Sequence, residues 1–163
     1  MINIILFEPE IANNTGNILR TCHAFNANLH LIRPYGFFLD SKYIKRSSTN
    51  HFDLENIKQY DSFDDFISKN NPDKIYMFSR YGQKMLDEYN YEDTNEDIYF
   101  MFGKESKGID KKILKNYLDT SIRIPMNEKS ISINLSNTVA IAIYEVIKQR
   151  KYFSLLKYEE FKE

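Results

Sequence analysis

Short, nearly continuous apolar runs alternate with helix-like segments along this sequence, and this alternation limits the possible folds more than any other property. Strands buried on both faces have such uninterrupted apolar character, whereas strands with one solvated face alternate polar and apolar residues. Strands are expected over residues 2–7, 29–32, 74–79, 98–102 and 121–124. Helices are expected after a cap at Asn13 or Asn14, over 40–46, from a Ser62 cap to Asn71, over 109–117 and over 135–149. The pattern predicts an α/β fold with a mostly parallel sheet covered by helices on both faces.

The length of the chain, 163 residues, indicates one domain over residues 1–150 and a short polar C-terminal tail over 151–163 that packs loosely. Its apolar runs are far shorter than the roughly 20 residues that a membrane helix needs. No basic-then-apolar leader opens the sequence, and the single cysteine, Cys22, cannot form an internal disulfide. We therefore expect a cytoplasmic globular protein with no membrane partner.

Missing motifs exclude several enzyme classes. No six-residue window holds the three glycines of a dinucleotide-binding loop. Gly103 and Gly108 have the spacing of a phosphate-binding P-loop, but Ile109 and Asp110 stand where that loop needs lysine and a hydroxyl residue. The three histidines and Cys22 have no zinc-ligand spacing, so no metal is expected, and no Gly-x-Ser-x-Gly turn is present for a hydrolase.

The charge balance argues against a broad nucleic-acid-binding surface. The chain has 22 basic and 23 acidic residues and a net charge of −1. Contact with RNA would therefore need a local basic patch.

Four segments place polar or glycine-containing sequence directly after predicted strands, where open α/β sheets bind ligands. They cover residues 8–20, 77–82, 102–108 and 124–137. Three of them contain recognisable motifs. Asn-x-Gly-x-x-x-Arg ends at Arg20, Phe-Gly-x-Glu-x-x-Gly covers 102–108, and Ile-Pro-Met at 124–126 precedes Asn-Leu-Ser-Asn at 134–137.

These motifs, in this order and spacing over residues 1 to about 150, resemble those of the SPOUT superfamily of RNA methyltransferases, in its SpoU branch. Two features resemble the minimal members of this branch: the sequence from Glu8 to Arg20, and the lack of an added RNA-binding domain. Those members methylate the ribose 2′-OH of the wobble nucleotide, cytidine or modified uridine at position 34 of tRNA. The resemblance implies a C-terminal deep trefoil knot, S-adenosylmethionine (SAM) as cofactor with S-adenosylhomocysteine as product, and a homodimer whose active site draws on both subunits. It implies the tRNA anticodon loop as substrate and no DNA partner.

Three other functions stay open at this point. The same chemistry could act on another RNA such as rRNA, or the fold could serve as a non-catalytic SAM- or RNA-binding module. The strand and helix pattern alone also fits a flavodoxin-like nucleotide-binding domain.

The resemblance implies seven cofactor-binding residues, most of them acting through backbone groups. They are Phe78, Gly103, Glu105, Gly108, Ile124, Met126 and Ser132. Glycine permits close backbone approach and positive φ, which suits Gly103 and Gly108. The simpler interpretation makes Phe78 and Ile124 core residues at strand ends, and Glu105 either a surface acid or an acceptor for backbone N–H groups.

The catalytic residues implied by the resemblance are Arg20, Asn134 and Tyr144. Because the pKa of arginine lies above about 12, a planar fork that holds a phosphate and stabilises a developing alkoxide suits Arg20 better than a general-base role. The alternatives are a surface arginine paired with Glu8 or Glu10, and a Tyr144 that only packs at a subunit interface.

The RNA-binding residues expected from the resemblance are Asn14, His23, Lys45 and Arg46, with Lys42, Arg123 and Lys129 extending the patch. The simpler interpretation makes His23 a partly buried structural histidine. One position departs from the family pattern: Ile131 precedes Ser132 where the family usually has arginine, and Lys129 is the candidate to replace that charge.

Overall fold

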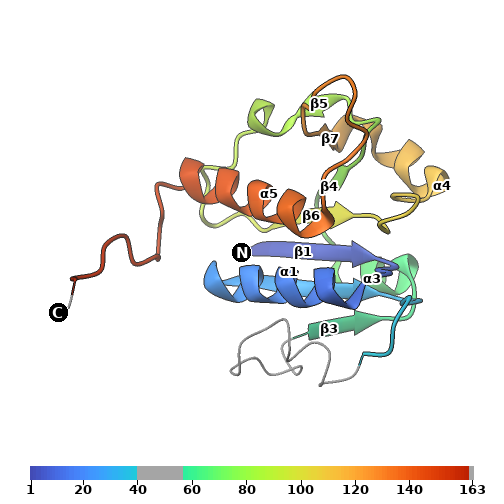
Figure 1. The fold of residues 1–163 in the computed structure, drawn as a ribbon, viewed down its shortest axis with the longest axis horizontal. Coiled ribbons are helices and arrows are strands. Elements are labelled where there is room, and N and C mark those ends of the chain that lie inside the picture. Colours follow the sequence, from blue (N-terminus) through green and yellow to red (C-terminus); the bar gives the residue numbers. More distant parts are fainter. Residues whose placement is uncertain (40–56, 162–163) are drawn as a thin grey trace.

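The computed structural model describes residues 1–39 and 57–161, and in this part every strand pair of the sheet is parallel (Figure 1). The strand order in space is β3-β2-β1-β6-β4-β7-β5. The strands are β1 (Ile2–Phe7), β2 (Ala27–Ile32), β3 (Ile57–Tyr60), β4 (Ile75–Phe78), β5 (Lys84–Met85), β6 (Ile98–Phe102) and β7 (Ser121–Arg123). The predicted fold class, a parallel α/β sheet, is confirmed.

Helices cover both faces of the sheet. They are α1 (Ala12–Ala24), α3 (Phe63–Asn70), α4 (Lys111–Leu114) and α5 (Leu135–Gln149), with 3-10 turns over Leu86–Glu88 and Lys115–Thr120. Figure 1 shows α1 and α5 side by side on one face, where they pack on Ile4, Leu6 and Phe100. The other face carries Ile5 and Met101 and is covered by α3 and α4. Because both faces are packed, successive strand residues alternate between two cores, which explains the uninterrupted apolar runs.

Most predicted elements are confirmed, and some helix starts and ends differ. Ser62 caps α3 as expected, since its Oγ accepts a hydrogen bond from the Asp65 backbone N–H at 3.1 Å. The prediction that Asn13 or Asn14 caps α1 is wrong: the helix begins at Ala12 without a side-chain cap. The Asn14 amide instead bonds to residues far away in the sequence, described below. The helix expected over 109–117 shortens to α4 and a 3-10 turn. The helix expected over 40–46 lies outside the described residues.

The chain crosses itself tightly at the C-terminal part of the sheet. Strand β7 lies between β4 and β5, although both precede it in the sequence. The turn over residues 79–83 passes β7, with Ser79 N–H donating to the Ile122 carbonyl at 3.0 Å and Gln83 N–H donating to the Ser121 carbonyl at 3.2 Å. A Cβ at Gly82 would lie 2.2 Å from the Ile122 carbonyl carbon, so only glycine fits at this crossing.

After α5 the chain runs away from the body of the molecule (Figure 1). Leu155 still packs partly against the core, while Leu156, Tyr158 and Phe161 are exposed. The division at residue 150 stays a prediction. Within the described residues, no helix has the length and apolar character to cross a membrane.

Candidate functional site

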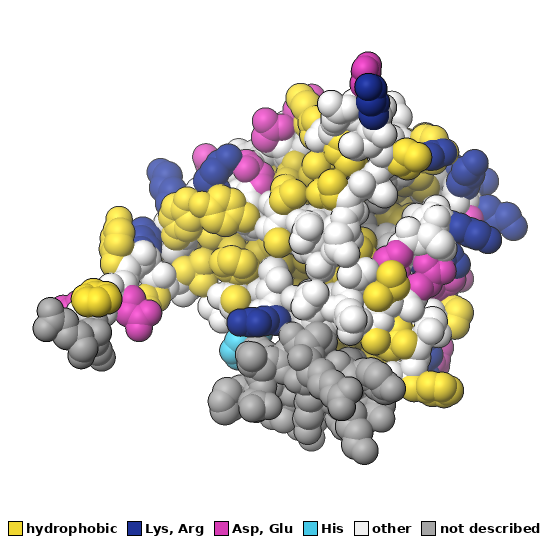
Figure 2. All heavy atoms as spheres, viewed as in Figure 1, with side chains coloured by type: hydrophobic (Ala, Val, Ile, Leu, Met, Phe, Trp, Pro, Cys, Tyr) yellow, Lys and Arg dark blue, Asp and Glu magenta, His cyan; other side chains and the backbone are white. Residues whose placement is uncertain are grey.

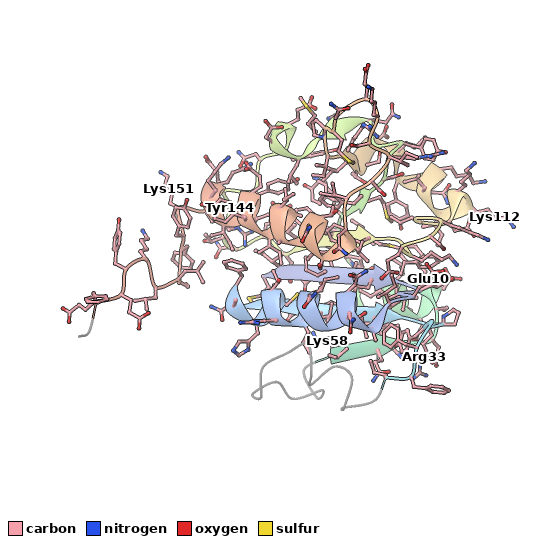
Figure 3. The ribbon with its side chains drawn as sticks, viewed as in Figure 1. Glu10, Arg33, Lys58, Lys112, Tyr144 and Lys151 are labelled. Carbon is pink, nitrogen blue, oxygen red and sulfur yellow. The ribbon has the colours of Figure 1, made fainter. Side chains whose placement is uncertain are left out.

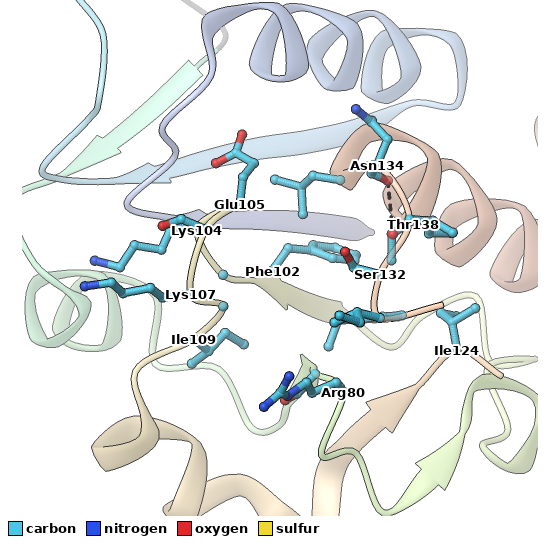
Figure 4. A pocket seen from close by; sticks show the side chains of 18 of the residues that line it. Arg80, Phe102, Lys104, Glu105, Lys107, Ile109, Ile124, Ser132, Asn134 and Thr138 are labelled. Atoms are coloured by element: carbon cyan, nitrogen blue, oxygen red, sulfur yellow. Dashed lines mark hydrogen bonds between the residues drawn. The ribbon is translucent and has the colours of Figure 1, made fainter. Parts of the chain in front are cut away.

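A cavity of about 780 Å³ opens at the carboxyl ends of β4, β6 and β7, and is named here the strand-end cavity (Figure 4). Its walls come from the segments around residues 78–81, 102–111, 122–126 and 131–138, with Ile11 and Asn14 from the start of α1. Such a volume suits a small organic ligand. The four segments singled out in the sequence thus meet at one place.

Three polar side chains from three separate motifs form a hydrogen-bonded chain at this cavity, and we call them the polar trio: Asn14, Glu105 and Asn134. Asn14 Nδ2 donates to Glu105 Oε1 at 3.0 Å, and Asn134 Nδ2 donates to Asn14 Oδ1 at 3.0 Å. Asn134 Oδ1 also accepts the Ser136 backbone N–H at 2.8 Å and thereby caps α5. The trio therefore fixes the start of α5 relative to α1 and the 103–108 loop.

Glu105 is bound through both of its oxygens. Its Oε2 accepts the Glu10 backbone N–H at 2.9 Å, in addition to the bond from Asn14. Of the two alternatives for Glu105, the acceptor of backbone N–H groups is confirmed. The carboxylate is therefore a structural anchor for the loop.

The segment before α1 holds the 103–108 loop by further charged contacts. Lys104 forms a salt bridge with Glu8, and the Ser106 backbone N–H and Oγ both donate to the Glu10 carboxylate at 2.8 Å. The hydrogen bond from the Ser106 backbone lowers the pKa of Glu10, so this acid stays ionised at neutral pH. Inside the loop, a Cβ at Gly103 would lie 2.0 Å from the Ile109 nitrogen.

All seven residues expected to bind the cofactor line the strand-end cavity: Phe78, Gly103, Glu105, Gly108, Ile124, Met126 and Ser132. Phe78 also belongs to the core, where its ring stacks on Phe102 at 4.4 Å, so its interpretation as a core residue is confirmed and its contact with a cofactor stays a prediction. Gly108 has a φ of 73°, the left-handed conformation that glycine adopts without strain.

Two of the three expected catalytic residues lie away from this cavity in the single chain. Arg20 is exposed on α1, and its side chain forms no hydrogen bond or salt bridge with any described residue. Its expected alternative, pairing with Glu8 or Glu10, is wrong because those acids bind Lys104 and Ser106. Only the third residue, Asn134, borders the cavity.

Tyr144 is half exposed, at 50%, near the C-terminal end of α5, while Glu10 lies toward the opposite end of the molecule (Figure 3). Its hydroxyl lies 3.3 Å from the Tyr152 hydroxyl. It borders a second, shallower hollow of about 580 Å³, whose apolar walls include Phe25, Leu86 and Ile141. This hollow is named here the α5 groove.

The expected RNA-binding residues that the structure describes do not form one patch. Asn14 lines the cavity as a buried residue, and His23 is exposed on α1, so its interpretation as a partly buried histidine is wrong. Lys42, Lys45 and Arg46 lie outside the described residues. Arg123 Nη1 donates to the Arg80 carbonyl at 2.7 Å, which ties its guanidinium to the chain crossing. Ile131, at the position that departs from the family pattern, is 71% exposed at the cavity mouth.

Sequence reasoning missed several residues of the cavity wall: Arg80, Tyr81, Lys111, Ile133 and Thr138. Arg80 and Tyr81 lie in the singled-out segment 77–82, which was a usable signal. No feature of the sequence near Lys111 indicated that α4 would reach the same cavity.

The fold and this site define a parallel α/β protein with a cavity suited to a small molecule at the carboxyl ends of its strands, beside a chain crossing. The chain belongs to the SpoU rRNA Methylase family, whose profile matches residues 1–144. The fold of this family includes a trefoil knot, and in this chain β7 lies between β4 and β5 with the turn over residues 79–83 hydrogen-bonded to it.

Relatives of the chain are similar over nearly their whole length. A protein of Mycoplasma pneumoniae with the provisional name tRNA (cytidine(34)-2′-O)-methyltransferase is 46% identical over 96% of this chain and 95% of its own. The crystal structure of an RNA methyltransferase, so assigned provisionally, from Bacillus anthracis has a TM-score of 0.89 at 40% identity, covering 97% of this chain and 100% of that one. A solved structure described as giving structural insights into the 2-OH methylation of C/U34 on tRNA has a TM-score of 0.84 at 33% identity. The match covers 93% of this chain and 97% of that one.

Proposed function

We propose that this protein methylates the ribose 2′-OH of the wobble nucleotide, cytidine or modified uridine at position 34 of tRNA, with SAM as methyl donor, in the cytoplasm. The polar trio at the mouth of the strand-end cavity is the observation that carries the proposal, because it joins all three motifs at one site. The choice of position 34 is supported by relatives of similar length that carry that assignment.

The residues of the strand-end cavity fit SAM by their chemistry. Phe78 and Ile124 provide apolar surface for the adenine, and backbone groups at Gly103, Gly108 and Ser132 provide donors and acceptors along an open wall. Bound there, SAM would supply an electrophilic methyl group. No carboxylate other than Glu105 lines the described part of the cavity, and its oxygens already accept hydrogen bonds.

The chain must position the ribose and assist loss of the proton from its 2′-OH as the new C–O bond forms. Asn134 is held at the cavity by Asn14 and offers a fixed amide toward an incoming ribose. Arg20 has the fork geometry to hold the adjacent phosphate and stabilise the developing alkoxide. Because Arg20 does not reach the cavity of its own chain, a second subunit is needed to supply it.

We therefore propose a homodimer in which Arg20 and Tyr144 complete the cavity of the partner subunit. The α5 groove supports this arrangement: Ile141 is 44% exposed, Tyr144 is 50% exposed, and both border an apolar hollow between α5 and residues 124–125. Figure 2 shows hydrophobic side chains gathered over α5 on this face of the molecule. A self-complementary apolar face is typical of twofold homodimers. Sedimentation at micromolar concentration should give a dimer, and Ile141→Glu should shift it to monomer.

Mixing two inactive variants tests the shared site. Arg20→Ala and Asn134→Ala are combined under conditions that exchange subunits. If Arg20 acts in the partner's cavity, each mixed dimer has one intact site, and activity returns to about a quarter of that of the wild type. If Arg20 acts within its own chain, no site is intact and the mixture stays inactive.

The reaction is tested with methyl-labelled SAM and separate pools of unmethylated tRNA and rRNA, digested to nucleosides. Label in 2′-O-methylcytidine or a 2′-O-methyluridine at position 34 of tRNA is the expected result. Label in rRNA alone would overturn the substrate. Absence of label in both pools would overturn the enzymatic function, and bound SAM would then indicate a non-catalytic module.

A further inference from the structure

Three cations at the strand-end cavity form no salt bridge with a carboxylate in the described part of the chain, and we name them the cationic rim: Arg80, Lys107 and Lys111. All three are exposed and line the cavity, and none forms a salt bridge with a described residue. The neighbouring Lys104, in contrast, is paired with Glu8. The rim is thus a local excess of positive charge in a chain whose net charge is −1.

Tyr81 brings the two segments of the rim together. Its ring lies 4.7 Å from the Arg80 guanidinium carbon and 5.8 Å from Lys111 Nζ, measured to the ring centroid. Arg80 Nη2 also donates to the Tyr81 hydroxyl at 2.5 Å. Arg80 follows β4 and Lys111 begins α4, so the aromatic ring holds charges from two elements at one side of the cavity.

The backbone below this cluster is fixed. Arg123 Nη1 donates to the Arg80 carbonyl at 2.7 Å, and the 79–83 turn is held against β7 by backbone hydrogen bonds. In the view of Figure 4, Ile109 lies between Arg80 and Lys107, on the side of the cavity away from Asn134 and Thr138. The cavity therefore has a neutral polar wall on one side and a cationic wall on the other.

The cofactor does not account for this charge. At neutral pH, SAM carries a sulfonium, an ammonium and a carboxylate, so its net charge is positive. One carboxylate could satisfy one cation, and the remaining two would face a cationic ligand. The only acid that lines the described part of the cavity, Glu105, is hydrogen-bonded to Glu10 and Asn14. A polyanion that reaches the cavity from solvent matches the rim better.

We propose that Arg80, Lys107 and Lys111 bind phosphates of the substrate RNA that flank the reacting nucleotide, with Tyr81 positioning Arg80 and Lys111. This inference rests on the proposed function, because the RNA must present a ribose at the strand-end cavity. It adds an RNA-contact surface on the side of α4, distinct from α1 and its Arg20. The RNA backbone then spans the cavity between the rim of one subunit and the arginine fork that the partner subunit supplies.

The test compares Arg80→Gln, Lys111→Gln and the triple variant that also carries Lys107→Gln with a matched control, Lys74→Gln. Lys74 is an exposed lysine that precedes β4, at the strand end opposite Arg80, and it does not line the cavity. The affinity of each protein for unmodified tRNA is measured between 50 and 200 mM KCl, and its affinity for SAM is measured by calorimetry without RNA. Circular dichroism and thermal unfolding verify that each variant is folded.

The expected result is weaker tRNA binding and a less steep slope of log K against log salt concentration. The slope should decrease in magnitude by about 0.7 for each phosphate that the variant no longer neutralises, and by about 2 for the triple variant. The control keeps the wild-type slope, and no variant binds SAM more weakly. An unchanged slope and affinity in the triple variant would overturn the proposal. So would weaker SAM binding with unchanged RNA binding, which would assign the cations to the cofactor carboxylate.

A failure of the proposed function can be distinguished from a failure of the RNA-binding proposal, because the two are tested by different measurements. Binding is measured whether or not a methyl group is transferred, and labelling of tRNA or rRNA by the wild type is scored in the nucleoside assay. A wild type that labels only rRNA refutes position 34, and the rim is then judged by the same salt slopes measured with that RNA.

Discussion

Replacing Glu105 with glutamine should damage both stability and catalysis, because its carboxylate accepts one hydrogen bond from a backbone N–H and one from an amide that orients Asn134. Glutamine keeps one acceptor oxygen but turns its NH₂ toward the second donor. At least one charge-assisted hydrogen bond is lost, which is worth about 1.5 to 3 kcal/mol when fully shielded. Since Glu105 is half-buried, we expect a loss of about 1 to 2 kcal/mol in the free energy of unfolding.

For a protein of 163 residues, such a loss lowers the thermal midpoint by roughly 2 to 8 °C. Methyl transfer should fall by at least about tenfold, because Asn14 no longer holds Asn134 in one orientation. The matched control is Glu92→Gln, which removes the same charge from an exposed side chain with no hydrogen bond to a described residue. It should leave both quantities unchanged.

Denaturant unfolding and single-turnover methyl transfer measure the two effects. A double-mutant cycle with Asn134→Ala should give non-additive losses in transfer rate, since both changes disrupt one hydrogen-bonded chain. Wild-type stability and rate in Glu105→Gln would refute the role of the polar trio. Strict additivity would show that Glu105 and Asn134 act independently.

Three further outcomes are expected. Gly82→Ala should lose about 3 kcal/mol or more of folding free energy, because its Cβ would lie 2.2 Å from the Ile122 carbonyl carbon. Gly108→Ala has open space around its Cβ but a φ of 73°, so it should lose only about 1 to 2 kcal/mol. Equal losses of the two variants in denaturant titration would contradict this reasoning. Arg20→Ala should abolish most methyl transfer with a thermal midpoint near that of the wild type, and a wild-type rate would remove Arg20 from the mechanism. Burial lowers the pKa of His30 to about 4, so between about pH 6.5 and 4 the unfolded chain binds a proton at this histidine and the folded chain does not. The free energy of unfolding should therefore fall by about 2 kcal/mol between pH 7 and pH 5. His30→Gln should make the free energy of unfolding less dependent on pH in this range.

The sheet could be predicted where the sequence carries uninterrupted apolar character, as in β1 and β6. Strand β3 was missed because Lys58 and Gln59 are exposed on an edge strand, so its apolar run is broken. Strand β5 has only two exposed residues and exists because β7 lies beside it. Both strands are formed by pairing with a neighbouring strand, which their own residues do not indicate.

The strand-end cavity could be predicted because each of its motifs ends a strand, and parallel strands bring their carboxyl ends together. The roles of Arg20 and Tyr144 could not be placed from one chain, since both side chains lie away from the cavity. The cationic rim was not foreseen because Lys111 reaches Arg80 only through the folded position of α4 and the ring of Tyr81.

The position of β7 between two earlier strands also sets when the site can exist during synthesis. A nascent chain that ends before Ser121 lacks β7, the 124–134 wall and α5, so β4 and β5 have no strand between them to pair with. Domains acquire structure as they emerge at about 5 to 20 residues per second, but this site needs residues from both ends of the domain. The complete site can therefore form only after the chain has been synthesised through α5, because an earlier fragment lacks Asn134 and its hydrogen bond to Asn14.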